Sequence, residues 1–205
     1  MNKVHLTFVC TIFALSILVA PVLQFSNAHQ RALYNINGKD MLFVIGSANE
    51  PLNVDDKTNV VFDAYWPNAS DPTSTDANGT QPVSGLEGML KVEILAGDKS
   101  MTSNLDPAFG EVGKYESETF YPTIPTTFNY RVFGDINGTA FDATFSCRPA
   151  GGEAAPSDNS TVEISENVVR KALQGGFGCP SERIGFPEQY ISQYEISQEL
   201  NKTSN

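Results

Sequence analysis

Short runs of alternating apolar and polar residues, separated by turn signals, fill the chain from Arg31 to Arg148. In the run from Leu90 to Leu95, apolar residues alternate mainly with lysine and glutamate, a period of two that is typical of a half-buried strand. The dipeptides Asn37-Gly38 and Asn137-Gly138 are strong signals for tight hairpins. Strands spaced roughly 8–15 residues apart, with almost no helical period, predict an all-β fold, an Ig-like antiparallel β-sandwich of about seven or eight strands.

The expected strands are short and are separated by polar, turn-rich segments. They lie at 41–45, 59–65, 89–95, 101–105, 113–122, 128–134 and 140–147, and a further strand precedes the first hairpin turn. Residues 67–82 are rich in proline, serine, asparagine and aspartate. This composition predicts a long loop rather than a strand.

The first 28 residues have the layout of a secretory signal peptide. Lys3 precedes an apolar run from Leu6 to Ala20, and Ser26-Asn27-Ala28 fits a small-x-small cleavage site. Cleavage after Ala28 would start the mature chain at His29 and place it outside the cytoplasm, with no insertion in the membrane. The alternative is an uncleaved anchor, because residues 6–23 are just long enough to cross about 30 Å of hydrocarbon.

The chain is strongly acidic, with 24 acidic and 13 basic side chains and a formal net charge of −11 at pH 7. Cleavage of the signal peptide would remove one more positive charge, that of Lys3. An acidic surface repels phosphate backbones and anionic lipid headgroups. Nucleic acid and anionic membranes are therefore excluded as expected partners.

Cys147 and Cys179 would be the cysteines left after cleavage, and in an exported protein such a pair predicts a disulfide. This bridge would tie a C-terminal appendage, residues 162–205, to a sandwich of residues 29–148 through a linker at 149–161. Within the appendage, Ser165 to Gly175 has a serine start, late basic residues and a glycine stop, which predicts a short helix. Residues 193–205 are expected to form a polar tail.

The chain contains several Asn-x-Ser/Thr sequons in segments that read as turns or tails, where a glycan acceptor must lie. These glycosylation candidates are Asn68, Asn78, Asn137, Asn159 and Asn201.

The candidate metal ligands are His29 and two aspartates. A histidine at the mature N-terminus offers an α-amine and an imidazole to one copper ion, but the second imidazole of a histidine brace is absent from the mature chain. Asp71 and Asp76 lie close together in the acidic loop and suggest calcium, although their spacing does not match an EF-hand. With one histidine left and no Gly-x-Ser-x-Gly elbow, the sequence predicts no enzyme.

Trp66, next to Tyr65, ends an expected strand. It either fills the rim of the core or exposes an aromatic surface for contact with a sugar or a protein.

Two stretches resemble known extracytoplasmic domains. Asp76 to Leu86, with the strand that follows it, resembles the D-x-x-G-x-x-V-x-G-L turn of Ig-like domains. Gly113-Lys114-Tyr115, the Pro122-Thr123 pair and the segment 128–134 look like the end of the same architecture. YtkA-like and CopC-like periplasmic sandwiches share this pattern, over about residues 32–148. The resemblance implies a style of fold. It does not extend to copper carriage, because the copper-carrying members use histidine and methionine ligands that are scarce here.

These observations predict a secreted or cell-envelope protein that binds or supports an envelope or extracellular protein partner and has no enzymatic activity. The open edges of the sheets would offer strand pairing to this partner. The alternative is an extracytoplasmic accessory protein that binds copper or calcium.

Overall fold

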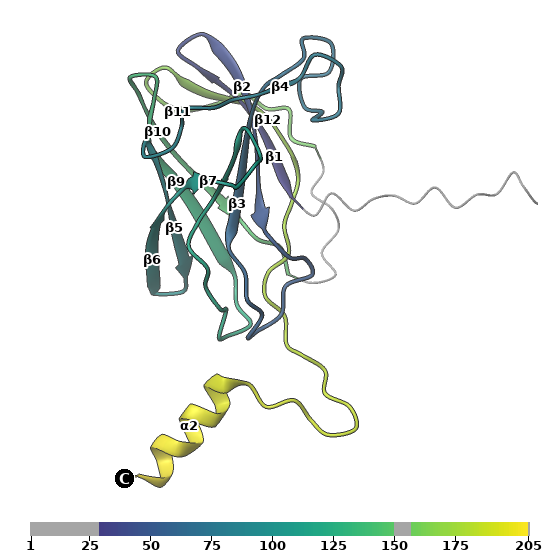
Figure 1. The fold of residues 1–205 in the computed structure, drawn as a ribbon, viewed down its shortest axis with the longest axis vertical. Helices are drawn as coiled ribbons and strands as arrows, with labels where there is room; N and C mark the ends of the chain where they lie inside the picture. The colour runs from purple at the N-terminus through teal and green to yellow at the C-terminus, as the bar shows by residue number, and fades with distance from the viewer. Residues whose placement is uncertain (1–28, 150–156, 205) are drawn as a thin grey trace, which may run out of the picture.

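The computed structural model describes residues 29–149 and 157–204, so the predicted signal peptide lies outside the described residues. The described chain forms two antiparallel sheets that pack face to face (Figure 1), which confirms the predicted β-sandwich. In these residues, no helix is long and apolar enough to cross a membrane.

The larger sheet has the strand order β11-β12-β1-β2-β3-β8-β7, and β4 pairs with β3. Its strands are β1 (Gln30–Ile36), β2 (Lys39–Ser47), β3 (Val60–Trp66), β4 (Gln81–Pro82), β7 (Asp106–Pro107), β8 (Lys114–Glu116), β11 (Val162–Ser165) and β12 (Val168–Gly175). The smaller sheet has the order β10-β9-β5-β6. It consists of β5 (Leu90–Ala96), β6 (Lys99–Asn104), β9 (Phe128–Ile136) and β10 (Thr139–Ser146).

Both predicted Asn-Gly dipeptides form the tight turns of hairpins. Asn37 and Gly38 take φ values of 49° and 81° between β1 and β2, and Asn137 and Gly138 take 54° and 82° between β9 and β10. Asparagine and glycine reach this left-handed region at low cost, which sets the register of each hairpin.

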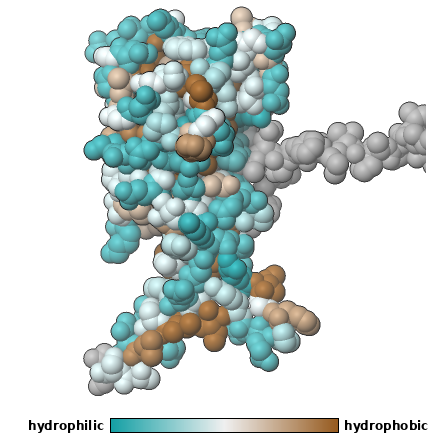
Figure 2. Space-filling view, viewed as in Figure 1, coloured by the Kyte–Doolittle hydropathy of each residue, from teal (hydrophilic) through white to brown (hydrophobic). Residues whose placement is uncertain are grey.

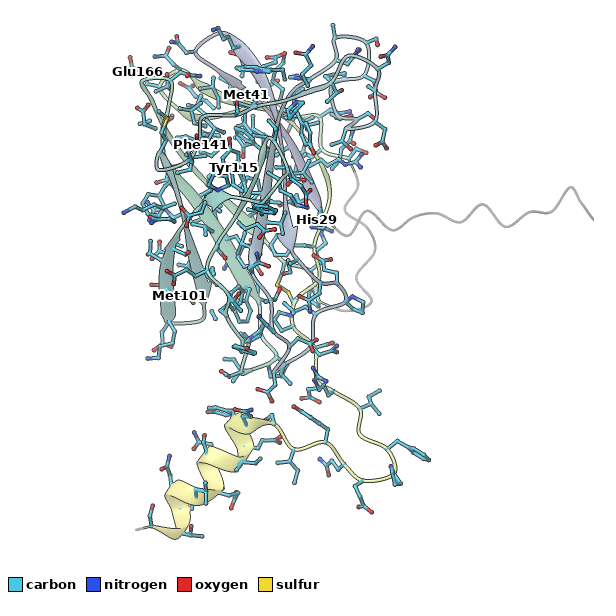
Figure 3. All side chains as sticks on the ribbon, in the orientation of Figure 1. His29, Met41, Met101, Tyr115, Phe141 and Glu166 are labelled. Carbon is cyan, nitrogen blue, oxygen red and sulfur yellow. A yellow bond between two sulfur atoms is a disulfide. The ribbon has the colours of Figure 1, made fainter. Side chains whose placement is uncertain are left out.

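Aromatic side chains from both sheets fill the core. The rings of Tyr34 and Phe43 in the larger sheet contact Phe141 of the smaller one, with centroids 5.2 and 5.3 Å apart. Phe62 packs on Phe43 at 4.9 Å. The labelled side chains of Met41, Tyr115 and Phe141 lie within the sandwich in Figure 3. The hydroxyl of the buried Tyr115 donates to the carbonyl of Val83 at 2.9 Å. This bond fixes the chain between β4 and β5 to the core.

The prediction of a helix over 165–175 is wrong, because these residues form the end of β11, a turn at Asn167 and all of β12. Strand β12 pairs with β1 along its length and buries Val168 and Ala172. The backbone hydrogen bonds to β1 outweigh a helical pattern that has few apolar positions. Residues 162–175 therefore belong to the larger sheet and are not a helical appendage.

The helix of the described chain, α2 (Gln193–Thr203), lies where the sequence predicts a polar tail. It stands beyond one end of the sandwich and is joined to it by an extended segment (Figure 1).

Candidate functional site

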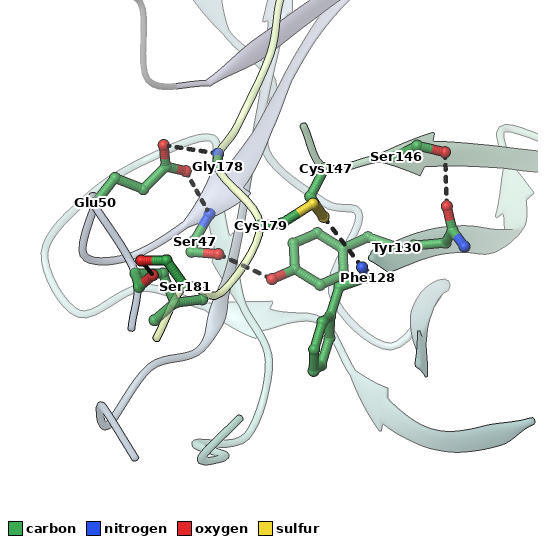
Figure 4. Close-up of a disulfide and its surroundings, with 11 residues drawn as sticks. Ser47, Glu50, Phe128, Tyr130, Ser146, Cys147, Gly178, Cys179 and Ser181 are labelled. Carbon is green, nitrogen blue, oxygen red and sulfur yellow. Dashed lines mark hydrogen bonds between the residues drawn. A yellow bond between two sulfur atoms is a disulfide. The ribbon is translucent and has the colours of Figure 1, made fainter. Parts of the chain in front are cut away.

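The predicted disulfide joins Cys147 and Cys179, whose Cα atoms are 4.9 Å apart. It connects the end of β10 to the segment that follows β12 (Figure 4). Two backbone hydrogen bonds support it: the Arg148 amide donates to the carbonyl of Phe177, and the Cys179 amide donates to the carbonyl of Arg148. The ring of Phe177 stacks on Tyr130 with centroids 4.7 Å apart. The chain therefore leaves the sandwich from a firmly held point.

Glu50, in the loop after β2, also binds the chain next to the disulfide, at Gly178. Its carboxylate accepts hydrogen bonds from the backbone amides of Ser47 and Gly178, each at 3.2 Å. Burial is the main influence on this group and raises the pKa of Glu50 to about 7, against the effect of the two amide donors.

This pKa predicts that Glu50 stabilises the fold at low pH. The protonated form is favoured in the folded chain, so its contribution is complete below the unfolded-state pKa and is lost as pH rises through about 7. We therefore expect the Tm of Glu50→Gln to rise relative to that of the wild type between pH 5 and 8. Glu182→Gln, an exposed change in the following segment, is the control and should show a constant difference. A constant difference for Glu50→Gln as well would contradict this assignment.

Residues 180–204, here called the C-terminal arm, bind the loop 52–56 on leaving the disulfide. The Val54 amide donates to the carbonyl of Ser181 at 2.9 Å, and the Ser181 amide donates to that of Leu52 at 3.0 Å. Arg183 donates to the carbonyl of Val54 at 2.9 Å and pairs with the carboxylate of Asp56. The first part of the arm is thus attached to the sandwich by backbone and charged contacts together.

A second aspartate holds the start of α2. The Asp55 carboxylate accepts the Tyr190 hydroxyl at 2.9 Å and the Gln193 amide, in the first turn of α2, at 3.0 Å. The guanidinium of Arg183 lies 5.5 Å from the centroid of the Tyr190 ring. An anion at a helix N-terminus also interacts favourably with the helix dipole. The loop therefore sets the position from which α2 projects.

We expect Asp55→Gly to release α2 without unfolding the sandwich. Asp55 has a φ of 63°, which glycine adopts freely, so the substitution removes the two accepted hydrogen bonds and adds no strain. The loss of two such hydrogen bonds should raise the rate of amide hydrogen exchange across α2 about tenfold or more. Asn37→Gly, at another positive φ, is the matched control. Unchanged exchange in α2 would show that Asp55 does not hold it.

The helix itself is well terminated. Ser192 accepts from the Glu195 amide at 3.2 Å, and the Glu195 carboxylate accepts from the Ser192 amide at 2.8 Å, which completes a capping box. Ile191 and Ile196 occupy the positions of a hydrophobic staple around this cap. These local signals stabilise the helix although α2 buries none of its residues.

The arm exposes an unusual amount of apolar surface. Figure 2 shows hydrophobic side chains along α2 and the segment before it. Ile184 and Phe186 are almost fully exposed, and four more side chains are 46–64% exposed: Ile191, Tyr194, Ile196 and Leu200. A cluster of this kind, rimmed by polar residues, is typical of an interaction site. The C-terminal arm is therefore the candidate functional site.

His29, the predicted copper ligand, lies directly before β1 and is labelled in Figure 3. Its ring packs over Gly46 so closely that a Cβ there would collide with it. Burial, followed by the charges of Lys114 and Arg31, lowers the pKa of His29. In residues 29–149 and 157–204, no three histidine, cysteine or acidic side chains gather as a metal site would require. Copper binding at His29 stays a prediction.

Asp71 and Asp76, the predicted calcium ligands, are exposed in the loop after β3. Ser74 holds the loop by two hydrogen bonds: its amide donates to the backbone carbonyl of Asp71 at 3.3 Å, and its hydroxyl accepts from the Asp76 amide at 3.2 Å. Among the described residues, neither carboxylate is part of a group of three or more potential ligands that could hold a metal ion. Calcium binding likewise stays a prediction.

The glycosylation candidates differ in their surroundings. Asn78, Asn137, Asn159 and Asn201 are exposed. Asn68 is half-buried, its amide nitrogen donates to the carbonyl of Asn78, and its amide oxygen accepts from the Ser70 hydroxyl at 2.6 Å. Because a glycan is attached to this amide nitrogen, the geometry favours the four exposed asparagines as acceptors.

Comparison with known protein families, curated proteins and solved structures finds no match for this chain. The resemblance to YtkA-like and CopC-like sandwiches therefore stays a prediction.

Proposed function

We propose that this protein acts outside the cytoplasm, as a non-enzymatic binding protein that attaches to a protein partner through its C-terminal arm. The signal-peptide layout of residues 1–28, the disulfide between Cys147 and Cys179 and the sequons support the location. The mass of the intact protein from its native source tests this part. We expect a chain that begins at His29 and is two hydrogens lighter than its reduced form.

The observation that carries the binding role is the apolar side of α2. Ile196 and Leu200 are four residues apart, so they lie on one face of the helix. A well-capped helix with exposed apolar anchors fits the helix-in-groove mode of recognition. Asp55, in the loop 52–56, binds the start of α2, and the helix projects away from the sandwich with these anchors (Figure 1). Such presentation lowers the entropy that binding would otherwise cost.

The charges of the arm define the partner further. Glu188 and Glu195 accompany the apolar anchors, Glu199 is paired with Lys202 at 2.6 Å, and the whole chain has a net charge of −11. A partner with an apolar groove and a rim of lysine or arginine would complement this surface. Two copies of so acidic a chain repel each other, which disfavours self-association as the role of the arm.

The sheet edges support strand pairing less well. The edge strands of the larger sheet, β7 and β11, have only 2 and 4 residues. The edges of the smaller sheet carry charged side chains, Lys99 on β6 and Asp142 on β10. Short and charged edges are the features by which proteins avoid edge pairing.

Site-specific photo-crosslinking tests the proposed binding surface. A photoreactive residue at position 200 of the full chain, returned to its native source, should form an adduct with one other protein. The matched control is position 101, where an exposed methionine lies on edge strand β6. An adduct from position 101 alone would support strand pairing instead. An adduct from position 200 with the mass of two copies would mean self-association, and either result would contradict the proposal.

A further inference from the structure

A groove crosses the outer face of the larger sheet, and none of the residues that line it belongs to the C-terminal arm. It has a volume of about 940 Å³ and lies between strands β1 and β12 and the loop that follows β3. This volume falls in the range of small-molecule sites, about 300–1,000 Å³. Leu33 and Ala172 form an apolar floor that is continuous with Leu42. Trp66, the last residue of β3, is half-buried: it packs against the main core and also lines the groove. The loop contributes Pro67 and Pro72.

The polar groups of the groove are fixed in place. The Asn35 amide nitrogen donates to one oxygen of Asp40 at 2.6 Å, and Lys171 donates to the other oxygen at 2.8 Å. The Asn35 amide oxygen accepts from the Gly38 amide at 3.1 Å. Each of these side chains keeps donor or acceptor capacity for a ligand. A network that is already ordered binds with a smaller loss of entropy.

The lining favours a ligand with many hydroxyl groups and apolar C–H faces. Three further amides, those of Asn68, Asn159 and Gln174, join Asn35 and the Asp40–Lys171 pair. Amides and carboxylates pair well with vicinal hydroxyls, and tryptophan and proline offer flat apolar surfaces. The net charge of −11 acts against a polyanionic ligand.

Hydrolysis of such a ligand is not supported by the groove. Glycosidases generally need two carboxyl groups, one on each side of the scissile bond. Asp40 is the one acidic residue among the described residues that line the groove, and it is paired with Lys171.

We infer that this groove is a binding site for a neutral oligosaccharide. The inference is independent of the arm, since none of the lining residues belongs to it. It assigns Trp66 a role in contact with a sugar, and it leaves the arm free to hold a protein partner.

The test uses Trp66, the one tryptophan of the chain, as a fluorescent reporter. The full chain, produced in a bacterial periplasm that adds no N-glycan, is titrated with cellotriose, triacetylchitotriose, maltotriose, mannotriose and laminaritriose. Calorimetry follows the same titrations. We expect a saturable change in fluorescence, with matching heat, for at least one of these neutral trisaccharides.

Two lysine variants locate the binding. Lys171→Met should weaken binding about tenfold or more, because it removes a charged donor from the groove. Lys99→Met is the matched control, since Lys99 pairs with Asp98 on the opposite sheet, and it should bind as the wild type does. The inference is overturned by no saturable binding to any probe, by heat without a change in Trp66 fluorescence, or by equal weakening in both variants.

Discussion

Loss of the disulfide between Cys147 and Cys179 should lower the free energy of unfolding by about 3–4 kcal/mol. The two cysteines are 32 residues apart, and the bridge removes the freedom of this loop from the unfolded chain. The loop contains the β11–β12 hairpin, which covers the edge of β1. Urea unfolding of the double variant Cys147→Ala/Cys179→Ala, compared with the oxidised wild type, measures the effect.

Reduction provides the control for this variant. A reducing agent should lower the stability of the wild type by a similar amount and leave the double variant unchanged. If the double variant is destabilised by less than about 1 kcal/mol, the bridge does not restrain the unfolded chain as the loop-entropy argument requires.

Replacement of Ile196 by aspartate should weaken the complex with the partner at least about a hundredfold. A central apolar anchor of an interface commonly carries this much affinity, and a carboxylate buried in an apolar groove has no partner there. The binding constant of the crosslinked partner, once isolated, measures the change. Because the arm is acidic, the affinity of the wild type should also fall as the salt concentration rises.

Gln198→Asp is the matched control for this prediction. It adds the same charge two residues along α2, on the side of the helix opposite to Ile196. We expect its affinity to stay within a few-fold of that of the wild type. Equal losses from both variants would mean that the helix, or the net charge, matters rather than its apolar face.

The sequence predicted the parts of the fold that depend on local signals. The hairpin turns at Asn37-Gly38 and Asn137-Gly138 are fixed by two residues each, and alternation marks which side of each strand is buried. The disulfide followed from a cysteine count. Each of these features can be recognised within a short window or from composition alone.

The features that the sequence did not predict depend on distant contacts. Residues 165–175 have a weak helical pattern, and only the exposed edge of β1 makes them a strand. Residues 193–205 were expected to form a polar tail, although the capping signal Ser192-x-x-Glu195 stands at the start of α2. The attachment of α2 to Asp55 joins residues more than a hundred positions apart. The groove likewise combines residues of β1, β12 and the loop after β3. No local pattern marks such a site.

The most direct measurement is amide hydrogen exchange of the full chain, alone and in complex with the partner captured at position 200. If the arm is the binding surface, exchange in α2 should slow on binding, while exchange in the edge strands β6 and β10 should not change. Slower exchange in β6 or β10, with α2 unaffected, would contradict the proposal and show that the partner pairs with a sheet edge.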